Sequence, residues 1–86
     1  MELKQINSFG KARCSCCGYF TISNVADTCP VCYWEENIYQ EENKNDEDAP
    51  NYISLIKAQI NFRLYGAKKE EFKDCTRKPY NNERSE

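Results

Sequence analysis

Four cysteines in two C-x-x-C pairs constrain this chain more than any other feature. Cys14 and Cys17 form the first pair, Cys29 and Cys32 form the second, and 11 residues separate the pairs. Each pair can turn two thiolates toward one point, and two pairs can supply the tetrahedral sulfur cage that zinc prefers. The spacing therefore predicts one structural zinc ion held by Cys14, Cys17, Cys29 and Cys32.

The chain is short enough for such a metal to decide whether it folds. It has 86 residues, of which 40% are hydrophobic, and a domain of this size buries only about 60–65% of the surface that its unfolded chain exposes. A structural zinc contributes on the order of 10 kcal/mol, which is comparable to the whole stability of a small domain. We therefore expect residues 1–86 to form a single, metal-dependent domain.

The N-terminal residues contain no continuous apolar stretch typical of a signal peptide, and no apolar run approaches the ~20 residues that cross a bilayer. The sequence thus predicts a cytoplasmic protein without membrane contact. Thiols stay reduced in that compartment, so paired cysteines there favour metal ligation over a disulfide framework.

The charge of the chain disfavours two classes of function. Fourteen acidic and 12 basic residues give a net charge of -2, and a zinc ion with four thiolates adds about -2 more, which suits a phosphate-rich partner poorly. The chain has no histidine and so lacks the usual general base. Four cysteine ligands also close the coordination position that a catalytic zinc keeps open, so we expect no enzymatic activity.

Residues 12–36 are predicted to form a zinc ribbon. Gly18 follows the first pair, where a chain that folds back around sulfur often needs a glycine conformation, and residues 19–22 are rich in strand formers. Trp34 follows the second pair, where we favour a lid over the small core above an exposed binding anchor. The sequence predicts a small zinc-bound α+β fold: a zinc ribbon of two cysteine knuckles with a short β-hairpin, packed against one C-terminal α-helix.

Acidic residues then dominate the chain, with only Lys44 opposing them before Ala49. Such a composition has too few apolar side chains to pack, so residues 37–50 are predicted to form a solvated loop. The candidate partner-binding residues in and beside it are Glu35, Glu36, Glu41, Glu42, Asp46, Glu47 and Asp48.

Residues 52–66 carry the signals of a helix. Ser54 is a good N-cap for a helix over 55–65, and Gly66 is suited to end it. The apolar residues in this stretch occupy more than one stripe, so a second apolar face is either covered by the N-terminal segment or docks a partner. Residues 67–86 are predicted to form a short helix near 70–72 and a tail whose last six residues fray.

The combination of these pieces resembles the cysteine-rich CPCC family of small, mostly bacterial proteins over about residues 12–80. The resemblance is carried by Cys14-Ser15-Cys16-Cys17-Gly18-Tyr19, by Cys29-Pro30-Val31-Cys32-Tyr33-Trp34-Glu35, and by a helix that opens at Ser54-Leu55 and ends Asn61-Phe62-Arg63 and Tyr65-Gly66-Ala67. It implies a zinc-binding domain, in a family whose function is essentially unknown.

Three positions depart from the family pattern. Ser15 replaces the proline that gives the family its name, Asp48-Ala49-Pro50 stands where relatives often have a glycine pair, and Cys75 matches no family cysteine. The resemblance therefore supports the choice of metal ligands more strongly than it supports the shape of the first turn or of the loop before the helix.

Two cysteines lie outside the predicted cage. Cys16 could replace Cys17 as a ligand, although the x-x spacing followed by glycine favours Cys17. As a spare thiol, Cys16 is expected to pack as a small residue, whereas oxidation of Cys16 or Cys75 with loss of the metal is the redox alternative. Iron in a rubredoxin-like site competes with zinc, because the same four sulfurs would hold it.

Two functional hypotheses remain. The first is a small regulatory or inhibitory protein, of the immunity, antitoxin or anti-defence type, which binds another protein through the acidic residues, the helix, or both; a basic partner would suit the acidic residues. The alternative is a nucleic-acid-binding ribbon with Tyr19 or Phe20 stacking on bases. That alternative requires six cations to converge on one face: Lys11, Arg13, Lys68, Lys69, Arg77 and Lys78.

Overall fold

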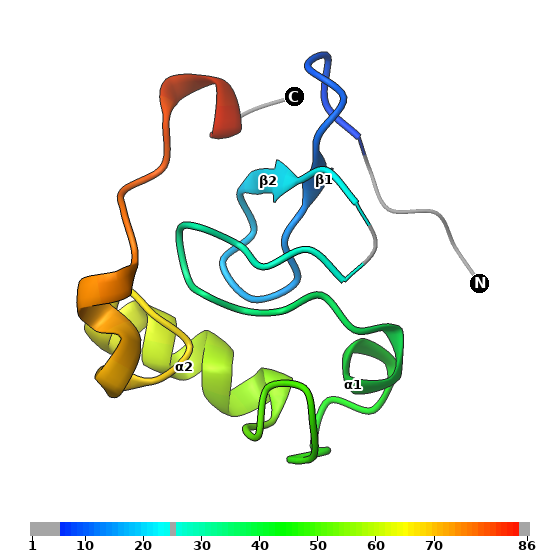
Figure 1. The fold of residues 1–86 in the computed structure, drawn as a ribbon, viewed down its shortest axis with the longest axis vertical. Coiled ribbons are helices and arrows are strands. Elements are labelled where there is room, and N and C mark those ends of the chain that lie inside the picture. Colours follow the sequence, from blue (N-terminus) through cyan, green and yellow to red (C-terminus); the bar gives the residue numbers. More distant parts are fainter. Residues whose placement is uncertain (1–5, 25, 85–86) are drawn as a thin grey trace.

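The first cysteine pair lies at the tip of a two-stranded antiparallel hairpin. The computed structural model describes residues 6–24 and 26–84. In it, β1 (Ala12–Arg13) pairs with β2 (Phe20–Ile22) across the turn that holds the cysteines (Figure 1). All three residues of β2 are buried, as expected for a stretch of strand formers in a small domain.

A turn at the N-terminal side extends this hairpin. Ile6 forms an isolated bridge with Ala12, and the Oδ1 atom of Asn7 accepts hydrogen bonds from the backbone N–H groups of Phe9 and Lys11. Gly10 completes the turn with a φ of 78°, a region that glycine enters without the steric cost paid by other residues.

The main helix, α2 (Leu55–Tyr65), has the boundaries that the sequence predicts. The Ser54 side chain accepts a hydrogen bond from the N–H of Lys57, which caps the first turn. Gly66 adopts the left-handed conformation and donates its N–H to the carbonyl of Phe62, which ends the helix.

The core lies between α2 and the cysteine-bearing turns. Its largest fully buried side chain is Trp34, which is 0% exposed, so the predicted lid of the core is confirmed and an exposed tryptophan anchor is wrong. Leu55 and Ala58 contribute the buried side of α2, and Ile22 and Val31 contribute apolar groups from the ribbon. This arrangement gives a small α+β fold with a helix packed on the hairpin region, as predicted.

The prediction that residues 37–50 form a solvated loop is wrong in part. A short helix, α1 (Ile38–Glu42), begins after Asn37, whose Oδ1 atom accepts the N–H of Gln40, while the Glu41 carboxylate accepts the N–H of Asn37. This reciprocal cap satisfies two backbone N–H groups at the start of α1. The acidic composition of the stretch did not indicate a helix there. Gln40 is fully buried, and Glu36 just before the helix is also buried.

A buried polar network explains how this segment packs without apolar side chains. Asn51, 2% exposed, donates its Nδ2 group to the Glu35 carbonyl and to Oε1 of Gln40, at 2.8 and 2.9 Å. Its Oδ1 atom accepts the N–H of Glu35 and the ammonium of Lys68, at 2.8 and 2.9 Å. Gln40 in turn donates to the carbonyls of Asp46 and Ile53. Buried polar groups that are paired in this way avoid the desolvation penalty.

Lys68 is an unusual member of this network because it is a buried cation. Burial lowers its pKa below the usual value. Its ammonium lies 5.6 Å from the ring centre of Tyr33 and 5.3 Å from that of Phe72, and these two rings stack with a centroid distance of 4.8 Å. Both contacts favour a cation in this position.

The C-terminal segment is ordered to a greater extent than predicted. The short helix expected near 70–72 is the 3₁₀ helix η1 (Glu70–Cys75), and a second one, η2 (Asn81–Glu83), falls within the stretch that we expected to fray. Glu83 forms a bidentate ion pair with Arg77, with both N···O distances 2.8 Å. This pair closes residues 77–83 into a compact turn; residues 85 and 86 lie outside the described part of the chain.

The ends of the described chain meet because the C-terminal segment returns to the hairpin. Figure 1 shows it leaving the end of α2 and rising beside the strands to η2. The N–H of Arg77 donates to the carbonyl of Pro30, and the Asn7 side chain donates to the carbonyl of Asn82. None of the helices in the described residues combines the length and apolarity required to cross a membrane.

Candidate metal centre

The first cysteine knuckle is closed by two backbone hydrogen bonds. The N–H of Gly18 donates to the carbonyl of Cys14, and the N–H of Cys14 donates to the carbonyl of Tyr19, at 2.9 and 2.8 Å. Gly18 has a φ of 82°, so the glycine conformation predicted at this position is confirmed. The tight turn brings Cys14 and Cys17 to the same side of the backbone.

The second knuckle repeats this geometry 15 residues later. The N–H of Tyr33 donates to the carbonyl of Cys29, and the N–H of Cys29 donates to the carbonyl of Trp34, at 2.8 and 2.9 Å. Tyr33 takes the place of the glycine, with a φ of 71°. The turn is closed by an isolated bridge between Thr28 and Glu35. Two related hairpin tips thus present one cysteine pair each.

The two pairs meet in one sulfur cluster. The Sγ atoms of Cys14, Cys17, Cys29 and Cys32 all lie within 4.8 Å of one another. Across the two knuckles, Cys14 is 3.5 Å from Cys32, and Cys17 is 3.7 Å from Cys29. A tetrahedral site with metal–sulfur bonds of about 2.3 Å requires sulfur–sulfur distances of roughly 3.8 Å. The four side chains therefore fit a tetrahedral metal ion.

The surroundings of the cluster favour ionised sulfur at one position in particular. Hydrogen bonds from Cys14, and further ones from Cys17 and Cys32, lower the pKa of Cys29. The hydroxyl of Thr21 lies 3.0 Å from the same sulfur and also lowers that pKa, and the N–H of Val31 reaches it at 3.4 Å. Hydrogen bonds donated to a thiolate stabilise its charge.

The other three thiols hold their protons more tightly. Hydrogen bonding with Cys17 raises the pKa of Cys14, and hydrogen bonding with Cys14 raises that of Cys32. The pKa of Cys17 falls through its contact with Cys14 but is raised overall by its contacts with Cys29 and Cys32. Four thiolates this close require a cation, because like charges disfavour one another's ionisation. Metal binding at this site therefore releases protons.

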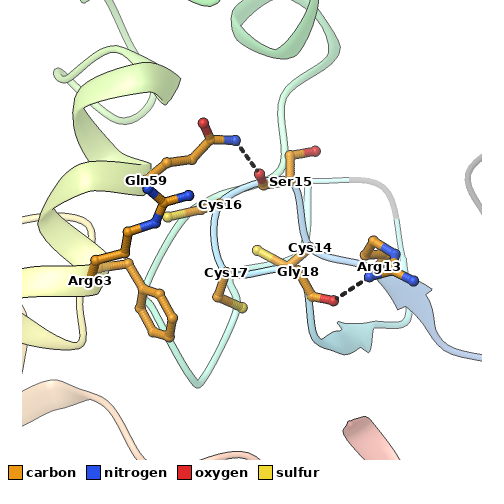
Figure 2. A pocket seen from close by; sticks show the side chains of 9 residues that line it. Arg13, Cys14, Ser15, Cys16, Cys17, Gly18, Gln59 and Arg63 are labelled. Atoms are coloured by element: carbon orange, nitrogen blue, oxygen red, sulfur yellow. Dashed lines mark hydrogen bonds between the residues drawn. The ribbon is translucent and has the colours of Figure 1, made fainter. Parts of the chain in front are cut away.

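Cys16 lies beside the cage without belonging to the group of four. It is 7% exposed and packs in the core, as expected for a spare thiol, and its hydrogen bonding contributes to the raised pKa of Cys32. In Figure 2 its side chain lies on the α2 side of the first knuckle. Cys75, at the end of η1, is exposed and lies outside the group of four.

The acidic residues predicted to bind a partner divide into three groups. Glu36 is buried, and its carboxylate accepts the N–H of Ser15, so it is unsuited to a surface contact. Glu35 and Asp46 are half-buried, as is Glu41, which caps α1. The exposed carboxylates are those of Glu42, Glu47 and Asp48, and Glu47 pairs with Lys57 at 3.0 Å.

Several of the cations required for nucleic-acid binding already form contacts within the fold. Lys68 is buried against Asn51, Arg77 pairs with Glu83, and the Lys11 ammonium bonds the hydroxyl of Ser23. Of the two candidate stacking residues, Phe20 is 1% exposed, so stacking of Phe20 on a base is wrong. Arg13 donates to the carbonyl of Gly18, so the remaining candidates are Tyr19, which is half-buried, and Lys69 and Lys78.

Comparison with known protein families bears on the same cysteines. A family model described as "Cysteine-rich CPCC" matches residues 12–83. The chain belongs to this family. Neither the curated proteins nor the solved structures searched gave a significant match.

In this cysteine-rich CPCC protein, the matched stretch coincides with the parts that build the fold. It begins at the first residue of β1 and ends at Glu83, the buried partner of Arg77. The C-terminal segment is thus part of the family domain, although the predicted resemblance ended near residue 80.

Sequence reasoning assigned no role at the centre to three residues near it. Thr21 was interpreted only as a strand former, yet it contacts the Cys29 sulfur. Tyr33 occupies the position of Gly18 in the other knuckle, which an alignment of the two C-x-x-C pairs would have indicated. Arg63 lies in a cleft beside the first knuckle, for which the sequence carries no local signal.

Proposed function

We propose that the chain is a zinc-stabilised protein-binding module that regulates or inhibits another protein. The proposal depends on the exposed side of α2. Ile56, Ile60 and Leu64 are spaced four residues apart and are 39%, 50% and 67% exposed. At about 100° per residue, Ile60 lies about 160° from the buried Ala58. The second apolar face predicted from the sequence is therefore uncovered within the described residues and is suited to a partner.

Zinc is the metal that best suits this role. Four sulfurs this close together could occupy every position around a tetrahedral ion, an arrangement typical of a structural zinc that contributes folding energy rather than chemistry. Elemental analysis of the purified protein tests the assignment. We expect one zinc per chain and loss of the folded state on chelation; stoichiometric iron, or a fold that survives complete metal removal, would contradict it.

The partner is expected to contact α2 with apolar side chains. Of the exposed carboxylates Glu42, Glu47 and Asp48, Glu47 lies beside α2, where it pairs with Lys57, and we expect the three to form an acidic rim. Charge at a rim affects the rate of encounter more than the final affinity. A basic, nucleic-acid-handling protein would suit that rim, and an inhibitor of the immunity, antitoxin or anti-defence type is the role that we propose.

Co-purification from the native cell tests the proposed function. Tagged wild-type protein is compared with Ile60→Glu, which places a charge at the centre of the apolar stripe. A matched control is Phe9→Glu, a substitution at a residue that is 61% exposed but lies in the N-terminal turn. We expect an identified partner at near-stoichiometric amount with wild type and Phe9→Glu, and its loss with Ile60→Glu. Recovery of nucleic acid alone would contradict the proposal.

A further inference from the structure

A cleft separates the first cysteine knuckle from α2. Its volume is about 560 Å³, and its walls include Ser15, Cys17 and Gly18 on one side and Gln59, Phe62 and Arg63 on the other (Figure 2). The side chain of Gln59 bridges the walls by donating to the carbonyl of Ser15 at 2.9 Å. The two walls are therefore held at a fixed spacing.

The charge of this cleft is opposite to that of the chain. The protein carries a net charge of -2, yet both charged side chains among the described lining residues are arginines, Arg13 and Arg63. Cys14 and Cys17 of the sulfur cluster line its other side, so the positive charge belongs to the arginine side of the cleft, and that side attracts groups of the other sign. The cleft is thus suited to an anionic group.

The two arginines are positioned differently. The Arg13 guanidinium donates to the carbonyl of Gly18 at 3.0 Å and lies 4.6 Å from the ring centre of Phe20, so its orientation is fixed by the fold. Arg63 is an exposed residue, and its guanidinium makes no hydrogen bond or ion pair with the residues that the structure describes. Arg63 is therefore the group with donors available for a ligand.

Arg63 also lies at the border between the cleft and the apolar stripe of α2. On a helix it is displaced by about 40° from Gln59, which lines the cleft, and by about 60° from Ile60, which is the centre of the stripe. An anion bound by Arg63 would have apolar surface beside it, namely the ring of Phe62 within the cleft and Ile60 outside it. The surface accordingly favours a ligand that carries an apolar group next to its anionic group.

The cage limits where the anion can bind. Cys17 lines the cleft on the knuckle side, and a cysteine sulfur is at most a weak hydrogen-bond donor to an anion. The guanidinium of Arg63 projects from α2, the opposite wall (Figure 2). A carboxylate is consequently favoured at Arg63, where bidentate bonding matches the planar geometry of both groups.

We propose that the cleft and the adjoining stripe of α2 bind a protein segment that carries a carboxylate next to an apolar side chain, with Arg63 recognising the carboxylate. The inference rests on the proposed protein-binding function and names the chemistry that its partner presents to α2. A peptide is favoured over a nucleic acid because one available arginine satisfies a carboxylate, whereas phosphate polymers require several cations along a track.

Selection from a random dodecapeptide library displayed on phage tests this inference on the zinc-loaded full chain. We expect the selected peptides to be enriched in Asp or Glu beside aliphatic or aromatic residues. A synthetic, fluorescein-labelled peptide of the consensus sequence then serves as the probe in anisotropy titrations. Arg63→Glu should weaken its binding about tenfold or more, and Arg63→Lys should weaken it less, because the loss of a charge-assisted bidentate pair is large.

Lys78→Glu is the matched control. It changes the net charge by the same amount as Arg63→Glu but alters an exposed residue of the C-terminal segment, so the probe should bind as it does to wild type. Equal weakening by both reversals, selection of peptides without acidic residues, or no enrichment would overturn the inference. So would an Arg63-dependent affinity for a 12-nucleotide oligo(dT) that exceeds the affinity for every selected peptide.

These outcomes separate the two proposals. Loss of the cellular partner with Ile60→Glu but not with Arg63→Glu would leave the protein-binding function standing and overturn the carboxylate inference. Absence of any cellular partner, together with Arg63-dependent binding of acidic peptides, would overturn the protein-binding function and leave the recognition of a carboxylate by Arg63 standing.

Discussion

Gly18 and Tyr33 occupy equivalent positions in the two cysteine knuckles, with φ angles of 82° and 71°. Each residue follows the second cysteine of its pair, and each donates its N–H to the carbonyl of the first cysteine. The left-handed conformation costs a residue with a side chain roughly 1 kcal/mol more than it costs glycine. The Tyr33 ring offsets this cost by stacking on Phe72.

Substitutions at Tyr33 separate backbone strain from ring stacking. Tyr33→Ala keeps the strain but removes the ring, so we expect it to lower the free energy of unfolding by about 1–2 kcal/mol. Tyr33→Gly loses the same stacking but relieves the strain, and should be about 1 kcal/mol more stable than Tyr33→Ala. Urea unfolding of the zinc-loaded proteins measures both values, and an alanine variant as stable as the glycine variant would contradict this account.

Cysteine substitutions test the ligand set. Because Cys14, Cys17, Cys29 and Cys32 form the sulfur cluster, replacing any one of them with serine should abolish stoichiometric zinc binding and the cooperative unfolding transition. Cys16→Ser should retain one zinc per chain, since Cys16 lies outside that group. Zinc content and circular dichroism provide the two readouts. A metal-free Cys16→Ser protein alongside a zinc-loaded Cys17→Ser protein would show that Cys16 is the ligand.

Asn51 is expected to be the most sensitive polar position outside the cage. Its side chain makes four hydrogen bonds at 2% exposure, and Asn51→Ala leaves Lys68 and Gln40 without these partners. We expect a loss of about 2–4 kcal/mol in the free energy of unfolding. Asn43→Ala, at the exposed end of α1, is the control and should cost less than about 1 kcal/mol. Similar losses in both variants would argue against the network.

The Arg77–Glu83 pair predicts a specific dependence of stability on pH. Hydrogen bonding with Arg77 lowers the pKa of Glu83 from its usual 4.5, so the pair stabilises the fold above about pH 4.5 and loses this effect as the pH falls through the lowered pKa. Glu83→Gln removes it at every pH. The difference in unfolding free energy between wild type and Glu83→Gln should be about 1 kcal/mol near pH 6 and should shrink below pH 4.5.

Cadmium-loaded protein is the suitable material for this measurement, because cadmium's softer character holds thiolates against protons to lower pH than zinc does. A difference that stays constant down to pH 3 would show that pairing with Arg77 does not lower the pKa of Glu83 in the folded protein. Arg84→Gln, an exposed substitution in the same segment, is the control that should show no such change.

The sequence by itself determined the features that depend on short-range geometry. The x-x spacing of the cysteines and the glycine after Cys17 are local requirements of a knuckle, so the four sulfurs could be chosen without a structure. Ser54 and Gly66 likewise predicted both ends of α2, because a helix cap involves residues only three or four positions apart.

Only the tertiary structure decided the features that depend on partners distant in the sequence. Gln40 and Glu36 belong to a stretch whose composition predicts a solvated loop, yet they are buried because Asn51 and Ser15 provide hydrogen bonds. The tail is ordered because Arg77 bonds both Pro30 and Glu83. Burial of a polar group is favourable only when its partner is in place, and local composition carries no information about that partner. The cleft at Arg63 has the same origin, since its two walls come from segments about 45 residues apart.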